Sequence, residues 1–308
     1  METCRLSLLG AEVDKVTPAF VLDFVARACA AGRGAVIANH NLHSLFLHAR
    51  RADVRAFYTQ AALIEFDSTP MIAWARLMGL PVTRAHRSTY LDFRDDFWAM
   101  AEARNLGVYH LGGAPGVGEA ARRAITARHP RARIDIHDGY FDVHGEDNAV
   151  VLADIAAKRP DILLVGMGMP RQELWILDNL ARLPPCVILT VGGAFDYEAG
   201  VQYLPPRWTG RFGVEWLARF LADPGRLFAR YFIEPWSLLP LAASDIALRL
   251  SGRGRQVVRA PFADTPAPWQ RRQALSSHVA VADSVAPAEA EIEEETAKPH
   301  RILMGGEL

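Results

Sequence analysis

Acidic side chains that directly follow short apolar runs are the first candidates for chemistry in this sequence. Asp67 follows the expected strand 62–66 and precedes Ser68-Thr69-Pro70, which is typical of a turn. A carboxylate at the end of a strand can act as a general base or bind a ribose or sugar hydroxyl. It can equally be the N-cap of the next helix, and the residue types alone leave both interpretations open.

A second group of polar side chains follows the apolar run 35–38, namely Asn39, His40, Asn41 and His43. The two histidines are potential zinc ligands, but no third ligand stands at a plausible spacing. Hydrogen bonding to a polyhydroxy substrate is therefore the favoured interpretation of this cluster.

The stretch 161–196 contains two apolar runs, 161–165 and 187–191, with a helix start between them. Two strands that flank one helix make a βαβ unit, and ligands of open α/β sheets bind at the carboxyl ends of the strands. The candidates at these ends are Gly168, Gln172, Glu173 and Asp196. Each of the three polar side chains also suits a purely structural role, in the first turn of a helix or as a cap.

A glycine turn, 112–116, joins the apolar run 108–111 to a helix that reaches His129. Backbone N–H groups at such a helix start can hold a phosphate, and Gly112 and Gly113 are the candidate residues. The turn matches neither the dinucleotide-binding fingerprint nor a P-loop, so a nucleotide sugar is favoured over a dinucleotide. A tight connection without any ligand is the simpler interpretation of a bare glycine turn.

Strands alternate with helices along the first 200 residues, which predicts an α/β fold: a Rossmann-like, mostly parallel sheet with helices on both faces. The residues 1–15 are expected to form an edge strand and a lead-in. Further strands are expected at 35–38, 62–66, 108–111, 132–136, 161–165 and 187–191. Helices are expected at 18–31, 45–58, 71–78, 89–104, 116–129 and 146–158, with another from residue 171.

The composition changes after residue 200, and we divide the chain into a Rossmann-like domain (1–200), an appendage (201–250) and a tail (251–308). The appendage is rich in arginine and aromatic residues, which suits a membrane interface or a lipid diphosphate as well as an ordinary amphipathic helix. Its prolines and acidic residues argue against a membrane-spanning helix. The tail is low in complexity, with an acidic run at 289–295, and is expected to be disordered.

Length and composition set broad limits on the class of protein. Half of the 308 residues are apolar, so the chain can bury a sizeable core, and a net charge of -1 gives no argument for a nucleic-acid partner. Three scattered cysteines without a CxxC pair predict neither a disulfide framework nor a zinc site. No signal peptide and no uninterrupted apolar run of about 18 residues is found, so a cytoplasmic location is expected.

Several motifs together resemble the WecG/TagA/CpsF glycosyltransferase family. The resemblance runs from about Leu6 to Tyr231, and collinear agreement of that extent is specific for the family but not for a donor or acceptor. The matching segments are 41–44, Asp67, 86–92, 111–117, 138–142, 165–173, 191–196 and 215–219.

The resemblance implies an inverting, metal-independent transfer of a sugar from a UDP-sugar to a polyprenyl-diphosphate-linked saccharide, without a cofactor. Products of the family are cell-surface polymers such as teichoic acid linkage units, enterobacterial common antigen and exopolysaccharides. Its fold is a Rossmann-like domain with a C-terminal appendage that helps close the site and meets the membrane. A peripheral protein on the cytoplasmic face of the membrane is implied, and the resemblance leaves open whether it is a homo-oligomer.

The resemblance also implies roles for individual residues. Asp67 matches the candidate base, Asn41 matches the asparagine of a Thr-x-Asn motif, and Arg87 matches an arginine that faces the leaving diphosphate. Thr89 and Asp92 match an Arg-x-Thr-x-x-Asp pattern. The matches that would bind sugar or uridine hydroxyls are Gln172, Glu173 and Asp196. The basic residues that would neutralise diphosphate are Arg219, Arg226 and Arg230.

Two residues depart from the family pattern. Asn39 replaces the threonine of the Thr-x-Asn motif, and Ser68 replaces the glycine that usually follows the aspartate. Both changes alter a substrate pocket and motivate an alternative hypothesis, a non-catalytic nucleotide-sugar-binding or scaffold protein of the same machinery. The hypothesis of an NAD-dependent oxidoreductase rests on the α/β pattern alone. It is disfavoured because the turn after the first strand lacks GxGxxG, and because fold does not determine function.

Overall fold

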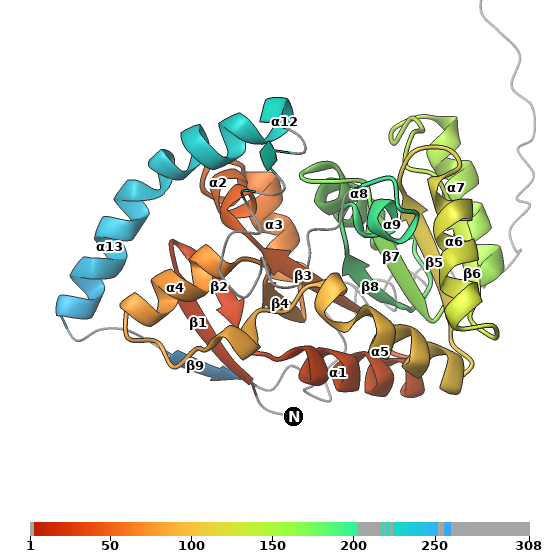
Figure 1. Ribbon diagram of the computed structural model, residues 1–308, viewed down its shortest axis with the longest axis horizontal. Coiled ribbons are helices and arrows are strands. Elements are labelled where there is room, and N and C mark those ends of the chain that lie inside the picture. Colours follow the sequence, from red (N-terminus) through yellow and green to blue (C-terminus); the bar gives the residue numbers. More distant parts are fainter. Residues whose placement is uncertain (1–2, 203–216, 218–219, 222–223, 252–255, 260–308) are drawn as a thin grey trace, which may run out of the picture.

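A six-stranded sheet in which every pairing is parallel forms the centre of the protein. The computed structural model describes residues 3–202, 217, 220–221, 224–251 and 256–259. The strands of the sheet are β3 (Ala35–His40), β4 (Leu63–Phe66), β5 (Gly107–Gly112), β6 (Arg133–His137), β7 (Ile162–Gly166) and β8 (Val187–Thr190). Their order across the sheet is β4-β3-β8-β7-β5-β6, so the two strands of the stretch 161–196 lie side by side in the middle (Figure 1). The predicted parallel α/β sheet is confirmed.

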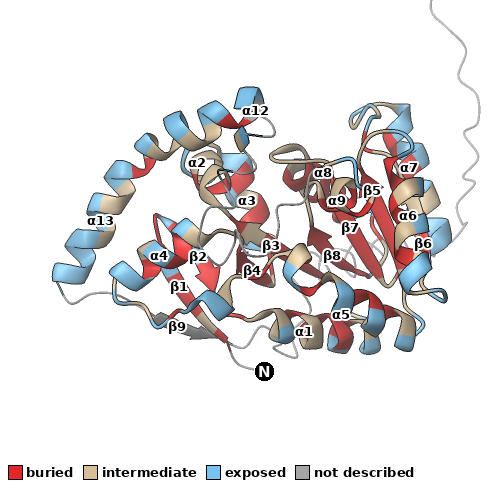
Figure 2. Ribbon diagram, viewed as in Figure 1, coloured by how far each residue is buried: buried red, intermediate tan, exposed pale blue. Residues whose placement is uncertain are grey.

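Helices cover both faces of this sheet. Successive side chains along each strand point to opposite faces and belong to two separate hydrophobic cores. On one face, Ile37 and Leu164 pack against helices; on the other, Val36 and Leu163 do so, and both faces are buried (Figure 2). The first face is covered by α1 (Pro18–Ala30), α5 (Tyr90–Ala103), α6 (Val117–Arg128) and α9 (Ala194–Glu198). The second is covered by α3 (Ala52–Gln60), α7 (Glu146–Lys158) and α8 (Arg171–Asn179).

The segment 39–60 differs from its sequence-based prediction in two ways. Asn39 and His40, expected in a loop, extend β3 because they pair with β4. The single helix expected at 45–58 is two helices, α2 (Leu42–Arg50) and α3, because Arg51 is extended with φ −118° and ψ 121°. The reciprocal hydrogen bonds of Asn41 and Ser44 start α2 earlier than predicted.

A second, antiparallel sheet lies beside the edge strand β4. It contains β1 (Thr3–Leu8), β2 (Ala11–Asp14) and β9 (Gln256–Arg259) in the order β2-β1-β9. Residues 1–15 were expected to form an edge strand and a lead-in, whereas residues 3–14 form a hairpin outside the main sheet. Residues 256–259 were assigned to the tail but pair with β1, and 260–308, including the predicted acidic run, lie outside the described residues.

A buried ion pair joins the two sheets. Arg5 donates from Nε to Asp14 Oδ1 at 2.8 Å and from Nη2 to Asp14 Oδ2 at 2.6 Å. The same Oδ2 accepts the backbone N–H of Ile64 in β4 at 2.9 Å. Both side chains are buried, so this carboxylate is fully engaged at the junction.

The C-terminal segment is helical and lies across α2, α4 (Thr69–Leu77) and the β1–β2 hairpin. It consists of α12 (Pro224–Phe228), the π-helical η2 (Ala229–Ile233), the 3₁₀-helical η3 (Glu234–Leu238) and α13 (Leu239–Leu250). Asp245 Oδ2 accepts the backbone N–H of Leu9 at 2.9 Å and the indole N–H of Trp74 at 2.8 Å. These bonds and the buried Leu238 hold the segment on the domain.

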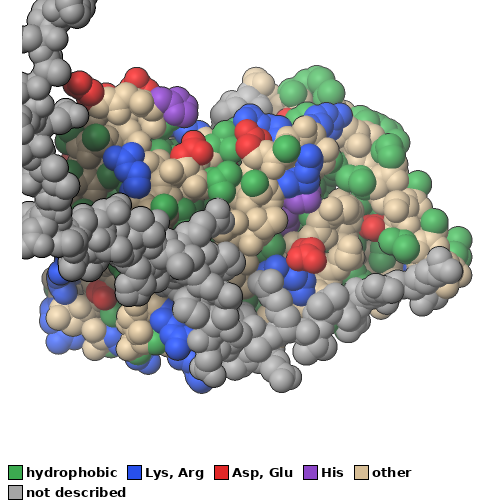
Figure 3. All heavy atoms as spheres, turned by 180° about the vertical axis from the view of Figure 1, so that it is seen from behind, with side chains coloured by type: hydrophobic (Ala, Val, Ile, Leu, Met, Phe, Trp, Pro, Cys, Tyr) green, Lys and Arg blue, Asp and Glu red, His purple; other side chains and the backbone are tan. Residues whose placement is uncertain are grey.

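Large apolar side chains of this segment remain exposed, among them Ile233, Trp236 and Leu239, with exposed fractions of 58%, 69% and 56%. Figure 3 shows hydrophobic side chains along the edge of the molecule that α12 to α13 form, at the right of that view. No helix within the described ranges has the length and apolar character needed to cross a bilayer.

Asp14→Ala should lower the free energy of unfolding by about 3–5 kcal/mol, because it leaves the buried Arg5 with only its 3.3 Å contact to the exposed Glu12 carboxylate. Urea denaturation of the full chain measures the change. Asp23→Ala is the matched control, since its pair with Arg27 is exposed and should contribute less than about 1 kcal/mol. Equal losses in the two variants would show that the junction does not depend on the buried pair.

Candidate active site

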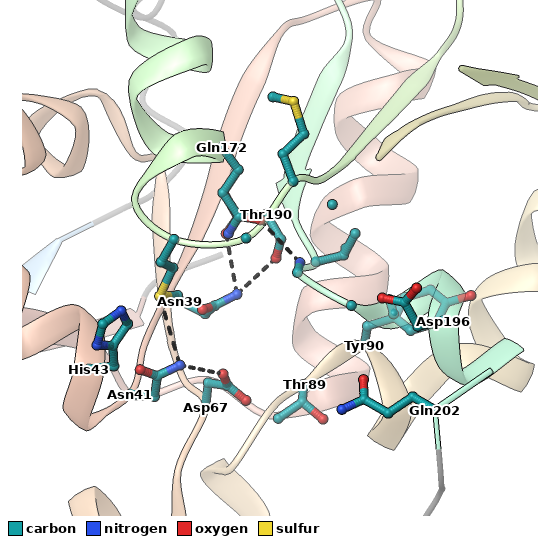
Figure 4. A pocket seen from close by; sticks show the side chains of 18 of the residues that line it. Asn39, Asn41, His43, Asp67, Thr89, Tyr90, Gln172, Thr190, Asp196 and Gln202 are labelled. Atoms are coloured by element: carbon teal, nitrogen blue, oxygen red, sulfur yellow. Dashed lines mark hydrogen bonds between the residues drawn. The ribbon is translucent and has the colours of Figure 1, made fainter. Parts of the chain in front are cut away.

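The carboxyl ends of the parallel strands open into one pocket of about 1930 Å³. Parallel strands all end at the same edge of their sheet, so side chains far apart in the chain meet there (Figure 4). The predicted site residues that line it are Asn39, Asn41, Asp67, Arg87, Thr89, Gly113, Gly168, Gln172, Asp196 and Arg230. The predicted residues Gly112, Asp92 and Glu173 do not line it.

Asp67 follows β4 and faces Asn41 within the pocket. The Asn41 amide Nδ2 donates to Asp67 Oδ2 at 3.1 Å, while Asn41 Oδ1 accepts the backbone N–H of Ser44 at 3.0 Å. The N-cap position of α4 is Ser68, so Asp67 is not the cap that one sequence-based interpretation required. Asp67 therefore lines the pocket without capping α4, and its predicted role as a base stays a prediction.

The segment 87–92 extends the wall of the pocket beyond β4. Arg87 forms a parallel bridge with Phe66, and the backbone N–H of Ser88 donates to Phe66 O at 2.9 Å. Asp92 accepts from Arg87 Nη2 at 2.8 Å and from Thr89 Oγ1 at 3.0 Å. Asp92, which was predicted to bind substrate, does not line the pocket; its two hydrogen bonds orient Arg87 and Thr89, which do line it.

Glu65 is a buried carboxyl group beneath this wall that the sequence analysis did not single out. Its Oε1 accepts from Ser88 Oγ at 2.5 Å. Burial raises the pKa of Glu65 to about 8, the Ser88 hydrogen bond opposes the rise, and the charges of Asp67 and Asp92 add to it. At pH 7 this carboxyl is mostly protonated.

Close approaches of backbone explain the glycines at the ends of β5 and β7. A Cβ on Gly112 would lie 2.3 Å from the carbonyl oxygen of Gly166, and Gly112 has φ +153°. The N–H of Gly113 donates to that same oxygen at 3.3 Å. The close approach of the two strands accounts for the glycine at position 112. Gly113 and Ala114 line the pocket, but the first residues of α6 do not. The phosphate-binding role predicted for this turn therefore stays a prediction.

Gln172 and Glu173 lie in the first turn of α8, bonded to each other, and Gln172 is also bonded to the turn at Gly192. Gln172 Nε2 donates to Glu173 Oε1 at 2.8 Å, and Gln172 Oε1 accepts the N–H of Gly192 at 3.2 Å. Burial raises the pKa of Glu173 to about 7, and the Gln172 bond and the charge of Arg230 oppose the rise. Gln172 thus shapes the Gly192 turn from inside the pocket, with Glu173 buried behind it.

Asn39 links the ends of β3 and β8 on the floor of the pocket. Its Nδ2 donates to the backbone oxygen of Thr190 at 2.8 Å and to Thr190 Oγ1 at 3.2 Å. Thr190 was expected only as part of the apolar strand 187–191 and not as a residue of the site. The sequence feature that could have identified Thr190 as a site residue is its position as a single polar residue at the carboxyl end of an apolar strand.

The C-terminal segment contributes one side of the pocket. Glu234 Oε2 lies 2.6 Å from His43 Nδ1, and both residues line the pocket together with Arg230. Burial and the charge of Arg230 lower the pKa of His43, and Glu234 opposes this. Glu234 is one of the acidic residues that argue against a membrane span, and no role in the site was predicted for it. Arg219 lies outside the described residues, as does the side chain of Arg226.

The two histidines that were weighed as zinc ligands do not meet. His40 is fully buried, with Nδ1 at 2.9 Å from Ser44 Oγ and its ring stacked on Tyr58 at 3.8 Å. His43 is paired with Glu234 at the pocket wall. Within the part of the chain that the structure describes, no group of three or more His, Cys, Asp or Glu side chains could hold a metal ion.

The structure is that of a Rossmann-like α/β protein whose sheet presents a carboxylate, amides and arginines to one cavity at its carboxyl edge. The family model of the "Glycosyl transferase WecG/TagA/CpsF family" matches residues 6–251, and the chain therefore belongs to this family of glycosyltransferases.

Two relatives are proteins of Staphylococcus aureus named "N-acetylglucosaminyldiphosphoundecaprenol N-acetyl-beta-D-mannosaminyltransferase". The protein of strain MRSA252 is 27% identical to this chain over 235 residues, and that of strain NCTC 8325 / PS 47 is 26% identical over 235 residues. Each match covers 73% of this chain and 87% of the relative. The expected family membership is confirmed.

Glu65→Gln should remove a pH dependence of stability. The folded chain holds a proton on Glu65 up to about pH 8, whereas its ordinary pKa is 4.5, so the free energy of unfolding falls as the pH rises between these values. Relative to wild type, the variant should gain up to about 1.4 kcal/mol per pH unit in that window. Urea denaturation at pH 5, 6, 7 and 8 measures the gain, with the exposed Glu119→Gln as control. A gain that does not change with pH would contradict the protonated state.

Proposed function

We propose that this enzyme transfers a sugar, of the N-acetylhexosamine class, from a UDP-sugar to a polyprenyl-diphosphate-linked saccharide. The observation that carries the proposal is the carboxylate of Asp67, held by Asn41 in a pocket that Arg87 and Arg230 also line. The names of the staphylococcal relatives support the same class of acceptor and of transferred sugar.

In this proposal Asp67 is the general base of a single displacement. The acceptor hydroxyl oxygen attacks the anomeric carbon, and its proton passes to the Asp67 carboxylate. As the new carbon–oxygen bond forms, the bond from the anomeric carbon to the diphosphate oxygen breaks, and UDP leaves with that electron pair. Attack opposite the leaving group inverts the anomeric configuration.

Arginines would supply the positive charge that stabilises the leaving diphosphate. Arg87 is fixed by its 2.8 Å bond to Asp92, and a charge fixed before the reaction needs no reorganisation during it. Arg230 lines the opposite, C-terminal side of the pocket, and Arg219 and Arg226 are further candidates from the sequence. No step of this scheme requires a metal ion.

The C-terminal segment would hold the enzyme on the cytoplasmic face of the cell membrane as a peripheral protein. Its exposed apolar residues include Phe228, Ile233, Trp236 and Leu239, and it borders the pocket through Arg230 and Glu234. Burial of apolar side chains at the acyl boundary favours such binding, and basic residues favour an anionic surface. A lipid-linked acceptor would then meet the pocket beside the membrane.

Asp67→Asn should retain the fold and UDP-sugar binding but lower the transfer rate by about 10²–10⁴-fold, because the amide cannot take up the proton. Transfer of radiolabelled UDP-sugar to a lipid-linked acceptor measures the rate, and thermal stabilisation by the UDP-sugar measures binding. Asp53→Asn, an exposed residue of α3, is the control. Full activity of Asp67→Asn would remove Asp67 as the base. Absence of transfer by the wild-type chain with a panel of UDP-sugars would favour the binding-protein alternative.

Ile233→Glu combined with Trp236→Glu should reduce partition onto vesicles that contain anionic lipid by at least about tenfold, since each charge opposes burial in the acyl region. Co-sedimentation with the vesicles measures the partition. Val150→Glu is the matched control, because Val150 is 65% exposed but belongs to α7. Unchanged partition of the double variant would contradict the proposed membrane face.

A further inference from the structure

The side-chain amide of Asn41 has one defined orientation. Asn41 Oδ1 accepts the backbone N–H of Ser44 at 3.0 Å and so caps α2. A backbone N–H can only donate, so the group that bonds to it must be the amide oxygen. The amide NH₂ group is thereby left to face Asp67, where it donates at 3.1 Å.

Ser44 holds Asn41 from the other direction as well. Its hydroxyl oxygen accepts the backbone N–H of Asn41 at 2.8 Å and lies 2.8 Å from the Asn41 carbonyl oxygen. Below it, His40 Nδ1 lies 2.9 Å from the same hydroxyl, and Tyr58 both stacks on His40 and donates to the Asn39 carbonyl oxygen at 2.8 Å. Ser44 and His40 are buried, so this support is rigid and shielded from water.

We propose that Ser44 is a positioning residue for the candidate base: with Asn41 it forms a reciprocal cap that presents only amide N–H groups to Asp67. This inference rests on the proposed function of Asp67. The opposite amide orientation would place a carbonyl oxygen against the carboxylate, and that contact would disfavour the ionised form that accepts the proton. The first turn of α2 thus serves the reaction as well as the helix.

Other titratable groups also act on Asp67. Glu65 belongs to the same strand and Tyr58 to α3, and the pKa values of both are raised in part by the charge of Asp67. Arg87 and His43 line the same pocket from the segment beyond β4 and from α2. Because Asn41 is neutral, its effect must be measured as a change in the titration of Asp67 while these groups stay in place.

Two substitutions separate capping from donation. Asn41→Asp keeps an acceptor for the Ser44 N–H, since Asp caps helices as well as Asn, but it replaces the NH₂ group by a carboxylate oxygen. Ser44→Ala removes the hydroxyl that holds Asn41. Thr17→Ala, which removes the side-chain cap of α1, is the control for lost helix capping.

The experiment follows the carboxyl carbon of Asp67 by NMR during a pH titration of the full-length chain, with the signal assigned by its loss in Asp67→Asn. We expect the titration midpoint to rise by at least one pH unit in Asn41→Asp and by a smaller amount in Ser44→Ala. Thr17→Ala should leave it unchanged. Ser44→Ala should add no shift in an Asn41→Ala background, because the two residues act as one unit.

An unchanged midpoint in both Asn41→Asp and Ser44→Ala would overturn the proposal, as would an equal shift in Thr17→Ala. The titration requires no turnover, so it is independent of the transfer assay. Activity of the Asp67→Asn variant would refute the role of Asp67 as general base but would not affect the conclusion on the orientation of the Asn41 amide. If Asp67→Asn loses activity as predicted but Asn41→Asp and Ser44→Ala do not shift the titration midpoint of Asp67, only the positioning role of Ser44 is refuted.

Discussion

Every strand of the main sheet runs in the same direction, and the site depends on that constraint. The six carboxyl ends meet at one edge, so the loops after β3, β4, β7 and β8 face a common cavity, and Asn39 and Thr190 bond there although 151 residues separate them in the chain. Glycines let neighbouring ends approach closely, most tightly where Gly112 passes the carbonyl oxygen of Gly166. The pocket is therefore a direct product of the fold.

Burial of polar groups around this edge gives the pocket its fixed shape. Glu65 and Glu173 lie behind the walls with raised pKa values, and each accepts a hydrogen bond from a neighbour, Ser88 or Gln172. Buried polar groups are costly unless they are bonded, so these pairs stabilise one arrangement of the loops. The rigid support lets neutral groups such as Asn41 present a single set of donors to Asp67.

The sequence was most informative where a local pattern determines structure. Apolar runs that end in polar residues predicted the parallel sheet. They also predicted that Asn41, Asp67 and Gln172 lie at one edge of it, and all three line the pocket there. Contacts between distant segments left no such pattern: β9 is four residues long and pairs with β1 at the other end of the chain, and His43 meets Glu234 across 191 residues. The buried Glu65 was hidden inside an apolar run, and its protonation follows from burial that only the fold creates.

The central claim is that an acceptor hydroxyl meets Asp67 while the donor diphosphate lies beside the arginines. A crystal structure of Asp67→Asn with an intact UDP-sugar and a short-chain lipid-diphosphate acceptor tests this most directly, because the variant should stop turnover. We predict the acceptor hydroxyl within about 3 Å of the residue 67 side chain and about 3–3.5 Å from the anomeric carbon. An acceptor hydroxyl turned away from residue 67, or a sugar bound outside the pocket, would contradict the account.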